Sequence, residues 1–256
     1  MNTQSLSGKK GLIVGIANAD SIAFGCARAL RAAGADLAVT YLNQKAEPHV
    51  RPLAESLDAG IIMPLNVEQP GETAAVFAAI KERWGALDFV VHSIAFAPAT
   101  DLQGRVVDCS AAGFQQAMHV SCYSLIELAR LAEPLMMDGG TILTMTFYGA
   151  DKVVKHYNLM GPVKAALQST VRYLAHELAP QGIRVHALSA GPLRTRAASG
   201  IGHFDRLVED AAERTPHRRL VTIEDVGNTA TFLISDAARS LTGDTIFVDG
   251  GRHIMG

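Results

Sequence analysis

Seven short apolar runs alternate along this chain with segments in which apolar residues recur at helical spacing. Alternation of this kind over a whole chain is typical of a parallel sheet with helices on both faces. Several runs, LIVGIA at 12–17 among them, are apolar at almost every position, as expected for strands buried on both faces. The chain is therefore predicted to form an α/β fold with one doubly wound parallel sheet of about seven strands, in a single domain at 1–256. The expected strands are Leu12–Ala17, Asp36–Leu42, Ile61–Val67, Leu87–Ile94, Thr141–Phe147, Ile183–Ser189 and Asp244–Asp249.

The segments between the strands are predicted to be helices. Gly34 is the expected end of the first one, because glycine readily takes the left-handed conformation that closes a helix. Thr222 and Asp225 resemble a capping box, although the acid is Asp rather than Glu or Gln. The other expected helices are Glu47–Leu57, Gly71–Trp84, a long helix capped by Ser110 that ends near Met136, a helix from about His156 to Leu178, and a helix after Thr222 that ends near Ser235.

Composition excludes several functional classes. The formal net charge is -2 over 256 residues, which argues against a dedicated nucleic-acid binder. No run approaches the roughly 18 uncharged apolar residues of a membrane span, so no membrane association is expected. The first residues, MNTQSLSGKK, do not resemble a secretory signal. Cys26, Cys109 and Cys122 show neither paired nor metal-ligand spacing, and we expect them to be small core residues in a reducing cytoplasm.

Tyr157 and Lys164 form the chemical pair of greatest interest. They are separated by six residues, close to two turns of helix, so both side chains are expected on one helical face. A phenol can donate a hydrogen bond to an oxygen that gains negative charge, and a nearby ammonium can hold a cofactor hydroxyl. Pro162 lies between them, and because proline is tolerated in a first helical turn, we expect this helix to begin near His156. By itself the pair also fits a surface tyrosine and lysine on an ordinary helix.

The turn after the first expected strand is suited to a pyrophosphate. Gly15 lies at the strand end, and Ser21 can cap the following helix or bond a phosphate oxygen. Gly25 is expected to let this helix pack closely on the strand. The loop is longer than G-x-G-x-x-G and has fewer glycines, so it fits an ordinary strand-turn-helix corner equally well.

Polar residues also follow other expected strands. Asn66 can hydrogen-bond an adenine amino group through its side-chain oxygen, and Ser93 lies where a nicotinamide ribose would run. After the second strand, residues 41–45 include neither an acid for the adenosine ribose nor an arginine for a ribose phosphate. The choice between NADH and NADPH therefore stays open.

These segments belong to a longer set of motifs. The chain contains G-x5-S-I-A-x-G from 15, HSIAFAP at 92–98, Y-N-x-M-G-x2-K at 157–164, SAGPLRTRAASGI at 189–201, TIEDVG at 222–227 and VDGG at 248–251. In this combination it resembles the enoyl-acyl-carrier-protein reductases of the short-chain dehydrogenase/reductase superfamily, which have a Rossmann-type fold. The Y-x6-K spacing and HSIA distinguish that family from the Y-x3-K and N-N-A-G of most of the superfamily.

The resemblance implies an activity. NADH would reduce the 2,3 double bond of a trans-2-enoyl thioester in fatty acid biosynthesis, with Tyr157 bonded to the thioester oxygen and Lys164 to the nicotinamide ribose; the donor of the α-carbon proton stays open. The implied cofactor contacts are Gly15, Ser21, Ile22, Asn66, Val67, Ser93, Ile94, Lys164, Leu193 and Thr195. The implied acyl-chain contacts are Ala97, Tyr157, Met160, Ala197 and Phe204, beneath a substrate lid at 191–214.

The resemblance further implies a cytoplasmic homotetramer that receives its substrate from an acyl carrier protein, although coenzyme A thioesters stay open as an alternative. Phe147 stands where many relatives have a second tyrosine, Leu42 where a polar adenosine contact is common, and Asn66 where Asp is common. These departures keep two other hypotheses open: a short-chain dehydrogenase/reductase acting on a carbonyl or hydroxyl group, and an NAD-binding protein without catalysis. The histidines that show no metal spacing and are interpreted as structural are His92, His119, His156, His186 and His253.

Overall fold

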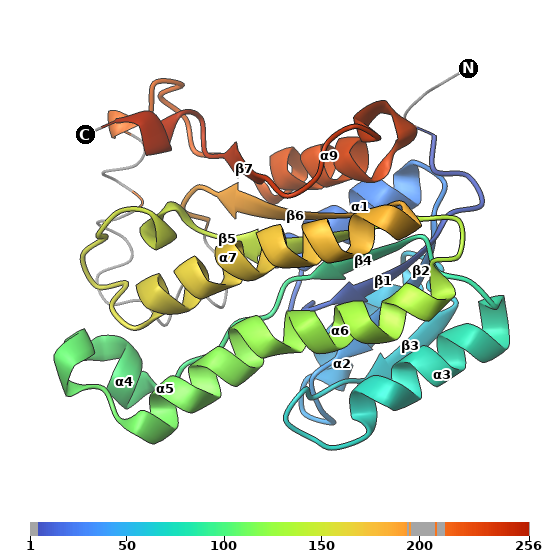
Figure 1. Ribbon diagram of the computed structural model, residues 1–256, viewed down its shortest axis with the longest axis horizontal. Coiled ribbons are helices and arrows are strands. Elements are labelled where there is room, and N and C mark those ends of the chain that lie inside the picture. The colour runs from blue at the N-terminus through green and yellow to red at the C-terminus, as the bar shows by residue number, and fades with distance from the viewer. Residues whose placement is uncertain (1–4, 194, 196–207, 209–212, 256) are drawn as a thin grey trace.

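The computed structural model describes residues 5–193, 195, 208 and 213–255. Its described strands form one parallel sheet in the order β3-β2-β1-β4-β5-β6-β7, so the predicted doubly wound sheet of seven strands is confirmed (Figure 1). The strands are β1 Lys10–Val14, β2 Asp36–Tyr41, β3 Ile61–Pro64, β4 Phe89–His92, β5 Gly140–Thr146, β6 Ile183–Ala190 and β7 Thr245–Val248. The expected runs often extended past these ends, because the apolar residues that follow a strand line loops at its carboxyl edge.

Helices cover both faces of the sheet, and each face has its own apolar core. One core is shared with α1 (Ile22–Ala32), α2 (Glu47–Glu55) and α9 (Ile223–Ile234). The other is shared with α3 (Glu72–Trp84), α6 (Ser124–Ala132) and α7 (Met160–Leu178), of which α6 and α7 lie in front of the sheet in Figure 1. Short 3₁₀ turns among the described residues are Val106–Asp108, Glu133–Leu135, Tyr148–Ala150, Ala179–Gln181, Asp236–Ala238 and Arg252–Ile254.

Several predicted helix signals are confirmed. Gly34 has φ +101° and closes the first helix. Thr222 and Asp225 form the capping box at the start of α9: Asp225 N donates to Thr222 Oγ1 at 3.2 Å, and Thr222 N donates to Asp225 Oδ2 at 2.9 Å. Ser110 accepts a bond from Gly113 N at 2.9 Å and caps α5 (Ala111–Met118).

The long helix expected after Ser110 is not one α-helix. A π-helical segment at His119–Tyr123 separates α5 from α6, and α6 ends at Ala132. Segments of this kind insert into α-helices most often at functional sites. This one faces the carboxyl end of β4, as the next subsection describes.

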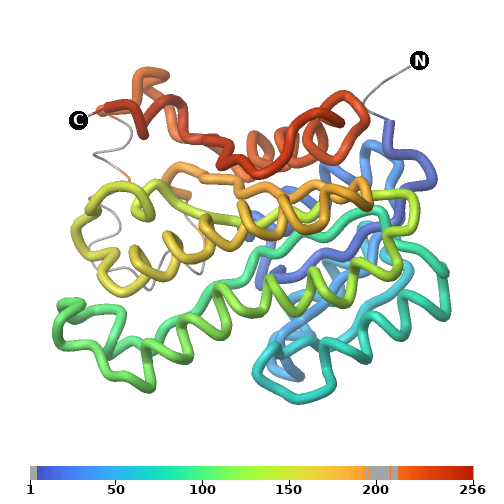
Figure 2. Tube along the Cα trace, viewed as in Figure 1, coloured from blue at the N-terminus to red at the C-terminus, as the bar shows by residue number. Residues whose placement is uncertain are grey.

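Gly25 packs against a helix and not against a strand, so that prediction was wrong. A Cβ atom at Gly25 would overlap the carbonyl oxygen of Ile223, and one at Gly227 would overlap the carbonyl oxygen of Gly25. The two glycines therefore let the backbones of α1 and α9 touch, and this contact fixes α1 on its face of the sheet. The loops at the carboxyl ends of the strands gather at one end of the sheet, on the left in Figure 2, where α4 (Ala99–Gln103) also lies.

Candidate active site

Tyr157 does not lie on the helix that carries Lys164. Helix α7 begins at Met160, and Tyr157 occupies the turn before it, between His156 at φ +67° and Asn158 at φ +44°. The predicted helix start near His156, and with it the shared helical face, was therefore wrong. Pro162 is the third residue of α7, as expected for a proline confined to a first turn. Extending the helix backward would place Pro162 in its interior, which explains the late start.

The phenol of Tyr157 is buried beside the end of β5. Its side chain is 7% exposed, and its ring meets Phe147 edge-on with centroids 4.9 Å apart. A Cβ atom at Gly149 would stand 2.6 Å from the Tyr157 ring, so a glycine is needed to make room for it. Burial raises the pKa of the Tyr157 phenol well above its usual range. The hydroxyl is therefore protonated at neutral pH and able to donate a hydrogen bond.

Lys164 lies at the same end of β5. Its Nζ donates to the carbonyl oxygen of Met145 at 2.7 Å, and the residue is only 6% exposed. Burial lowers the pKa of Lys164 to about 8, with Cys122 acting weakly in the opposite direction. The ammonium is therefore mostly charged at pH 7, and one bond to Met145 leaves further donors for a ligand.

Asn158, which the sequence reasoning missed, anchors the Tyr157 turn. Its Nδ2 donates to the carbonyl oxygen of Leu102 at 2.8 Å, joining the turn to α4. Asparagine tolerates the left-handed conformation found there better than most residues. The Tyr-Asn pair in the sequence was the signal that could have indicated a turn instead of a helix.

The expected substrate residues meet in a third, smaller apolar cluster. Tyr157 and Met160 are both buried in it, and Ala97 packs against it from the loop after β4. Ala197 and Phe204 lie outside the described residues, as does most of the expected lid at 191–214.

Asp101 fixes the elements next to this cluster. Its Oδ1 accepts from Ser110 N at 2.5 Å, and a Cβ atom at Gly113 would overlap its other oxygen. Hydrogen bonds from the Ser110 backbone hold the pKa of Asp101 below its usual range. The carboxylate therefore joins α4 to the start of α5 and shapes the wall beside Tyr157.

Gly15, Ser93 and Ile94 come together where the sheet reverses its strand order. Gly15 has φ +110°, and a Cβ atom there would overlap the carbonyl oxygen of Ser93 and lie 3.2 Å from Ile94 Cγ2. Ser93 N donates to Val14 O at 2.9 Å, which extends the contact between β1 and β4. Ligands of doubly wound sheets bind at this crevice, beyond the carboxyl ends of the strands.

Ser21 and Ile22 stand at the start of α1, but Ser21 does not cap it with its side chain. The Ser21 hydroxyl instead accepts from the backbone amides of Ala17 and Asn18, both at 3.0 Å, and donates to Asn18 Oδ1 at 3.1 Å. The predicted capping role was therefore wrong, because the hydroxyl braces the loop. The first amides of α1 receive no side-chain acceptor from it.

Asn66 and Val67 follow β3 at the same edge. Asn66 Oδ1 accepts from Glu68 N at 3.0 Å, so the oxygen expected to reach adenine already forms a local turn. Val67 O lies 3.1 Å from His119 Nε2 in the π-helical segment. On the far side, Leu193 is 9% exposed and its carbonyl accepts from Thr195 N at 2.8 Å.

The π-helical segment holds the loop that follows β4. Ser121 Oγ accepts from Phe96 N at 3.0 Å and donates to Phe96 O at 3.2 Å, so one hydroxyl clamps both backbone groups. His92, the last residue of β4, lies between Thr144 Oγ1 at 2.7 Å and Ser124 Oγ at 2.9 Å. Ser121, Ser124 and Thr144 were not predicted, because their partners are distant in the sequence.

His92, His119 and His253 each bond to other groups of the protein, as expected for structural histidines. His253 Nδ1 lies 3.0 Å from both oxygens of Asp249 and its ring stacks on Phe247 at 3.8 Å. Among the described residues there is no group of three or more His, Cys, Asp or Glu side chains that could hold a metal ion. Nor does any described helix combine the length and apolarity needed to cross a membrane.

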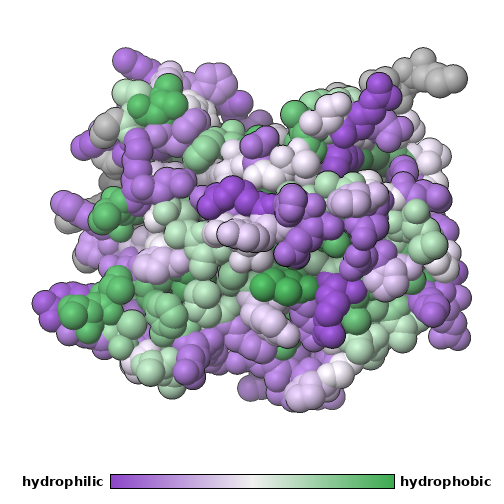
Figure 3. Space-filling model, viewed as in Figure 1, coloured by the Kyte–Doolittle hydropathy of each residue, from purple (hydrophilic) through white to green (hydrophobic). Residues whose placement is uncertain are grey.

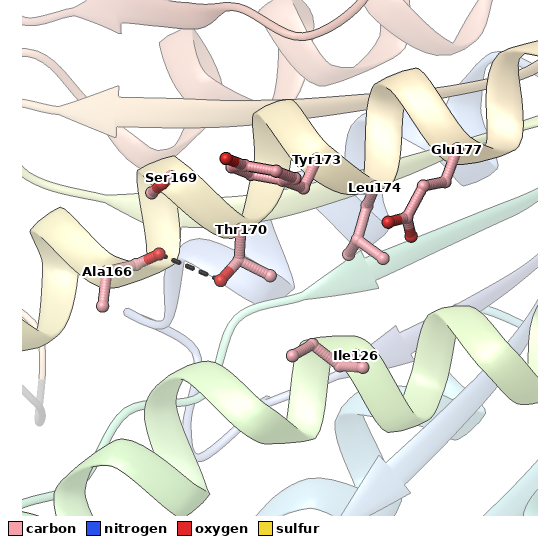
Figure 4. Close-up of a pocket in the computed structure, with 7 residues that line it drawn as sticks. All are labelled: Ile126, Ala166, Ser169, Thr170, Tyr173, Leu174 and Glu177. Carbon is pink, nitrogen blue, oxygen red and sulfur yellow. Dashed lines mark hydrogen bonds between the residues drawn. The ribbon is translucent and has the colours of Figure 1, made fainter.

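A hollow lies away from Tyr157, on the outer face between α6 and α7. Its cavity of about 430 Å³ is lined by Ile126, Ala166, Ser169, Thr170, Tyr173, Leu174 and Glu177 (Figure 4). In Figure 4 the Tyr173 ring lies along the surface of α7, and Ile126 points toward α7 from α6. Apolar side chains lie between α6 and α7 in this region, beside strongly hydrophilic ones (Figure 3).

Comparisons with known proteins match the whole chain. Residues 15–253 match the family described as "Enoyl-(Acyl carrier protein) reductase". The enoyl-[acyl-carrier-protein] reductase [NADH] FabI of Rickettsia felis is 46% identical over 256 residues, covering 100% of this chain and 98% of the relative. That of Bacillus cereus is 47% identical over 253 residues, covering 98% and 99%. A solved enoyl-(acyl-carrier-protein) reductase of Anaplasma phagocytophilum in complex with NAD has TM-score 0.94 and 48% identity, covering 98% of this chain and 96% of that one.

Proposed function

The chain belongs to the enoyl-(acyl carrier protein) reductase family, and from this premise we propose that Tyr157 and Lys164 are its catalytic residues. It is an NADH-dependent enoyl-[acyl-carrier-protein] reductase of the short-chain dehydrogenase/reductase superfamily, and it reduces the 2,3 double bond of enoyl thioesters in fatty acid biosynthesis. The two other hypotheses, carbonyl reduction and binding without catalysis, are not favoured by these relatives.

The residues at the strand ends suit a dinucleotide. Gly15 leaves no room for a side chain beside Ser93, so a ligand can approach the backbone closely at this crevice. The bound cofactor, NADH, supplies the hydride. We infer that it is held by Gly15, Ser21, Ile22, Asn66, Val67, Ser93, Ile94, Lys164, Leu193 and Thr195.

Tyr157 would act on the oxygen of the thioester. When hydride reaches the β-carbon, negative charge develops on that oxygen, and a protonated phenol stabilises it by donating a hydrogen bond. The raised pKa of Tyr157 supports this role, because the buried phenol keeps its proton in the ground state. One such donor typically lowers the barrier by about 3 kcal/mol. The burial of the Tyr157 phenol, which keeps it protonated, is the observation that carries the assignment.

Lys164 would orient the nicotinamide ribose. Its ammonium is fixed by Met145 O at 2.7 Å and retains donors for ribose hydroxyls. Its positive charge also lowers the cost of negative charge near the Tyr157 phenol. Ala97, Met160, Ala197 and Phe204 would contact the acyl chain together with Tyr157, beneath a lid at 191–214.

We further infer that the thioester is delivered on an acyl carrier protein, and that the protein acts in the cytoplasm as a homotetramer. The free thiols of Cys26, Cys109 and Cys122 fit a reducing compartment.

The outer face of α6 and α7 supports self-association, since Tyr173 is 68% exposed and Ile126 is 38% exposed around the hollow of Figure 4. Sedimentation of the wild type against Ile126→Glu tests this: a variant with unchanged mass would contradict the assignment of that face.

The reaction is tested by assaying crotonyl and acetoacetyl thioesters side by side with NADH. We expect NADH oxidation with the crotonyl substrate and almost none with the acetoacetyl substrate. Preference for the acetoacetyl substrate would support carbonyl reduction instead. Binding of NADH without turnover of any enoyl substrate would support a non-catalytic protein.

A further inference from the structure

The adenosine end of the cofactor site lacks its usual acid. Dinucleotide enzymes commonly place an Asp or Glu near the carboxyl end of β2, where it accepts hydrogen bonds from the adenosine ribose. Here β2 ends at Tyr41, and the next residue, Leu42, exposes 55% of its surface. The first carboxylate after the strand is Glu47, the first residue of α2.

Glu47 is paired with a cation that lies over the end of β2. Its Oε1 accepts from Arg51 Nε at 2.8 Å and from Arg51 Nη2 at 2.6 Å. The guanidinium carbon of Arg51 stands 5.9 Å from the centroid of the Tyr41 ring. Helical side chains lean toward the helix N-terminus, so Arg51 leans toward the carboxyl edge of the sheet. The pair therefore lies near the end of β2, and both hydrogen bonds from Arg51 go to one oxygen of Glu47.

The backbone amides at this corner are also engaged. Asn43 Oδ1 accepts from Lys45 N at 3.0 Å and from Ala46 N at 3.1 Å, ahead of α2. Free amides before a helix are a common way to bind a phosphate. Asn43 thus occupies these amides and Glu47 occupies Arg51, so two potential partners of a ribose 2′-phosphate are already bonded within the protein.

We propose that Glu47 is the residue that selects NADH over NADPH in this chain. It neutralises Arg51, which would otherwise attract a 2′-phosphate, and its second oxygen opposes that phosphate by charge. Glu47 thus takes the role of the missing acid at the strand end, from one turn further along the chain. The proposal rests on the assigned use of NADH and deepens it.

The test compares NADH with NADPH in the wild type and in four variants, one of which is a control. Binding of each dinucleotide is measured by its fluorescence, and kcat/KM is measured with a crotonyl thioester, for the wild type, Glu47→Gln, Arg51→Gln and the double variant. Glu55→Gln, which removes an exposed carboxylate from the last position of the same helix, is the matched control. We expect Glu47→Gln to tighten NADPH binding about tenfold, as a new charge-assisted phosphate contact does. NADH binding should not improve.

The double variant shows which cation binds the 2′-phosphate of NADPH once Glu47 is replaced. If Arg51 is the group released, the gain in NADPH binding disappears in Glu47→Gln/Arg51→Gln, whereas a persisting gain would point to Lys45 and overturn the role of Arg51. An unchanged NADPH to NADH ratio in Glu47→Gln, or an equal gain in Glu55→Gln, would overturn the proposal. Failure of the assigned function is separate, because it would appear as absent NADH turnover in the wild type.

Discussion

His92 Nε2 lies 2.9 Å from Ser124 Oγ, and this bond ties the end of β4 to the helix that follows the π-helical segment. Ser124 Oγ donates to Val120 O at 2.7 Å, so it accepts from His92, whose Nε2 must carry the proton. The other ring nitrogen then accepts from Thr144 Oγ1 at 2.7 Å. The imidazole is therefore fixed as one neutral tautomer next to the loop that follows β4.

Acidification should destabilise the protein through His92. Burial, with a smaller effect of the Lys164 charge, lowers the pKa of His92 to about 3. Between about pH 3 and the usual histidine value near 6.5, the unfolded chain binds a proton that the folded one does not, so stability rises with pH across that window and is lost on acidification.

The variant His92→Gln removes this titration. Its free energy of unfolding should depend on pH less steeply than that of the wild type between pH 4 and 6, by up to about 1.4 kcal/mol per pH unit. Urea unfolding at pH 4.5, 5.5 and 7.5 measures the difference. Parallel curves for the two proteins would mean that His92 is not the group responsible.

Replacing Tyr157 by Phe should remove the hydrogen bond to the thioester oxygen. We expect kcat/KM to fall on the order of 100-fold, matching the loss of one such donor, while the Kd for NADH stays within about twofold. Tyr173→Phe is the control, because it removes an exposed hydroxyl from α7, where Tyr173 is 68% exposed. Turnover and NADH fluorescence titrations give both quantities, and an undiminished rate in Tyr157→Phe would contradict the mechanism.

NADH affinity should weaken as pH rises through about 8. The pKa of Lys164 lies near that value because the ammonium is buried, and only the charged form attracts and holds the ribose firmly. Above pH 8 the Kd for NADH should rise, approaching tenfold per pH unit. In Lys164→Met the affinity for NADH should be weak and independent of pH. A wild-type Kd that stays flat from pH 7 to 9.5 would argue against this role.

Lys164 should affect stability in the opposite direction: its contribution to the free energy of unfolding should increase as pH rises. Between about pH 8 and the usual lysine value near 10.4, the unfolded chain holds a proton that folded Lys164 has lost, so this group makes the fold more stable as pH rises. Unfolding curves of the wild type and Lys164→Met, compared at pH 7.5 and 9.5, separate this effect from ligand binding.

The sheet could be predicted from the sequence, whereas the conformation of Tyr157 could not. A strand such as β4, with Phe89, Val90 and Val91 in succession, is apolar at nearly every position because both faces are buried, so composition alone indicates it. The spacing of Tyr157 and Lys164 fits two helical turns, but Pro162 and the left-handed residues on either side of Tyr157 prevent that arrangement. Their cause is partly non-local, since Asn158 is held by Leu102 O.

The contacts around the loop that follows β4 could not be predicted for a related reason. Ser121 and Phe96 are 25 positions apart, and His92 and Ser124 are 32 apart, so neither pairing leaves a local pattern in the sequence. Ser21 was expected either to cap α1 or to bond a phosphate oxygen, but it does not cap the helix, because the amides of Ala17 and Asn18 compete for its hydroxyl. The residues expected to form the lid lie mostly outside those that the structure describes.

Arg184 should matter far more to stability than a surface arginine. Its guanidinium donates to four carbonyl oxygens at the end of α9 and in the turn that follows, those of Leu233, Ile234, Ser235 and Ala238, at 2.6 to 3.4 Å. Arg184→Met would remove the charged donor that these carbonyl oxygens share, at a cost on the order of 3 kcal/mol.

Arg28→Met provides the matched control for that change. Arg28 pairs with Glu224 at 3.0 Å, and both side chains are about half exposed. Loss of an exposed pair costs about 0–1 kcal/mol. Urea unfolding of the two variants measures both values, and equal losses would show that the carbonyl contacts of Arg184 contribute little.

Gly25→Ala should weaken NADH binding through the position of a helix. The added Cβ would overlap the carbonyl oxygen of Ile223 and stand 2.6 Å from Ile223 Cβ, so α1 and α9 would have to separate. Overpacking of this kind costs about 1–3 kcal/mol of stability. Because α1 begins directly after the Ser21 loop, a shift of this helix also moves the amides assigned to the pyrophosphate.

We therefore expect Gly25→Ala to raise the Kd for NADH several-fold, while kcat at saturating NADH changes little, since Tyr157 and Lys164 belong to elements on the other side of the sheet. Gly104→Ala is the control, because its Cβ would meet only Thr100 O at 3.3 Å. Fluorescence titration and urea unfolding of both variants check the expectation. A destabilised Gly25→Ala protein with unaltered NADH affinity would mean that the α1–α9 contact supports the fold without positioning the cofactor.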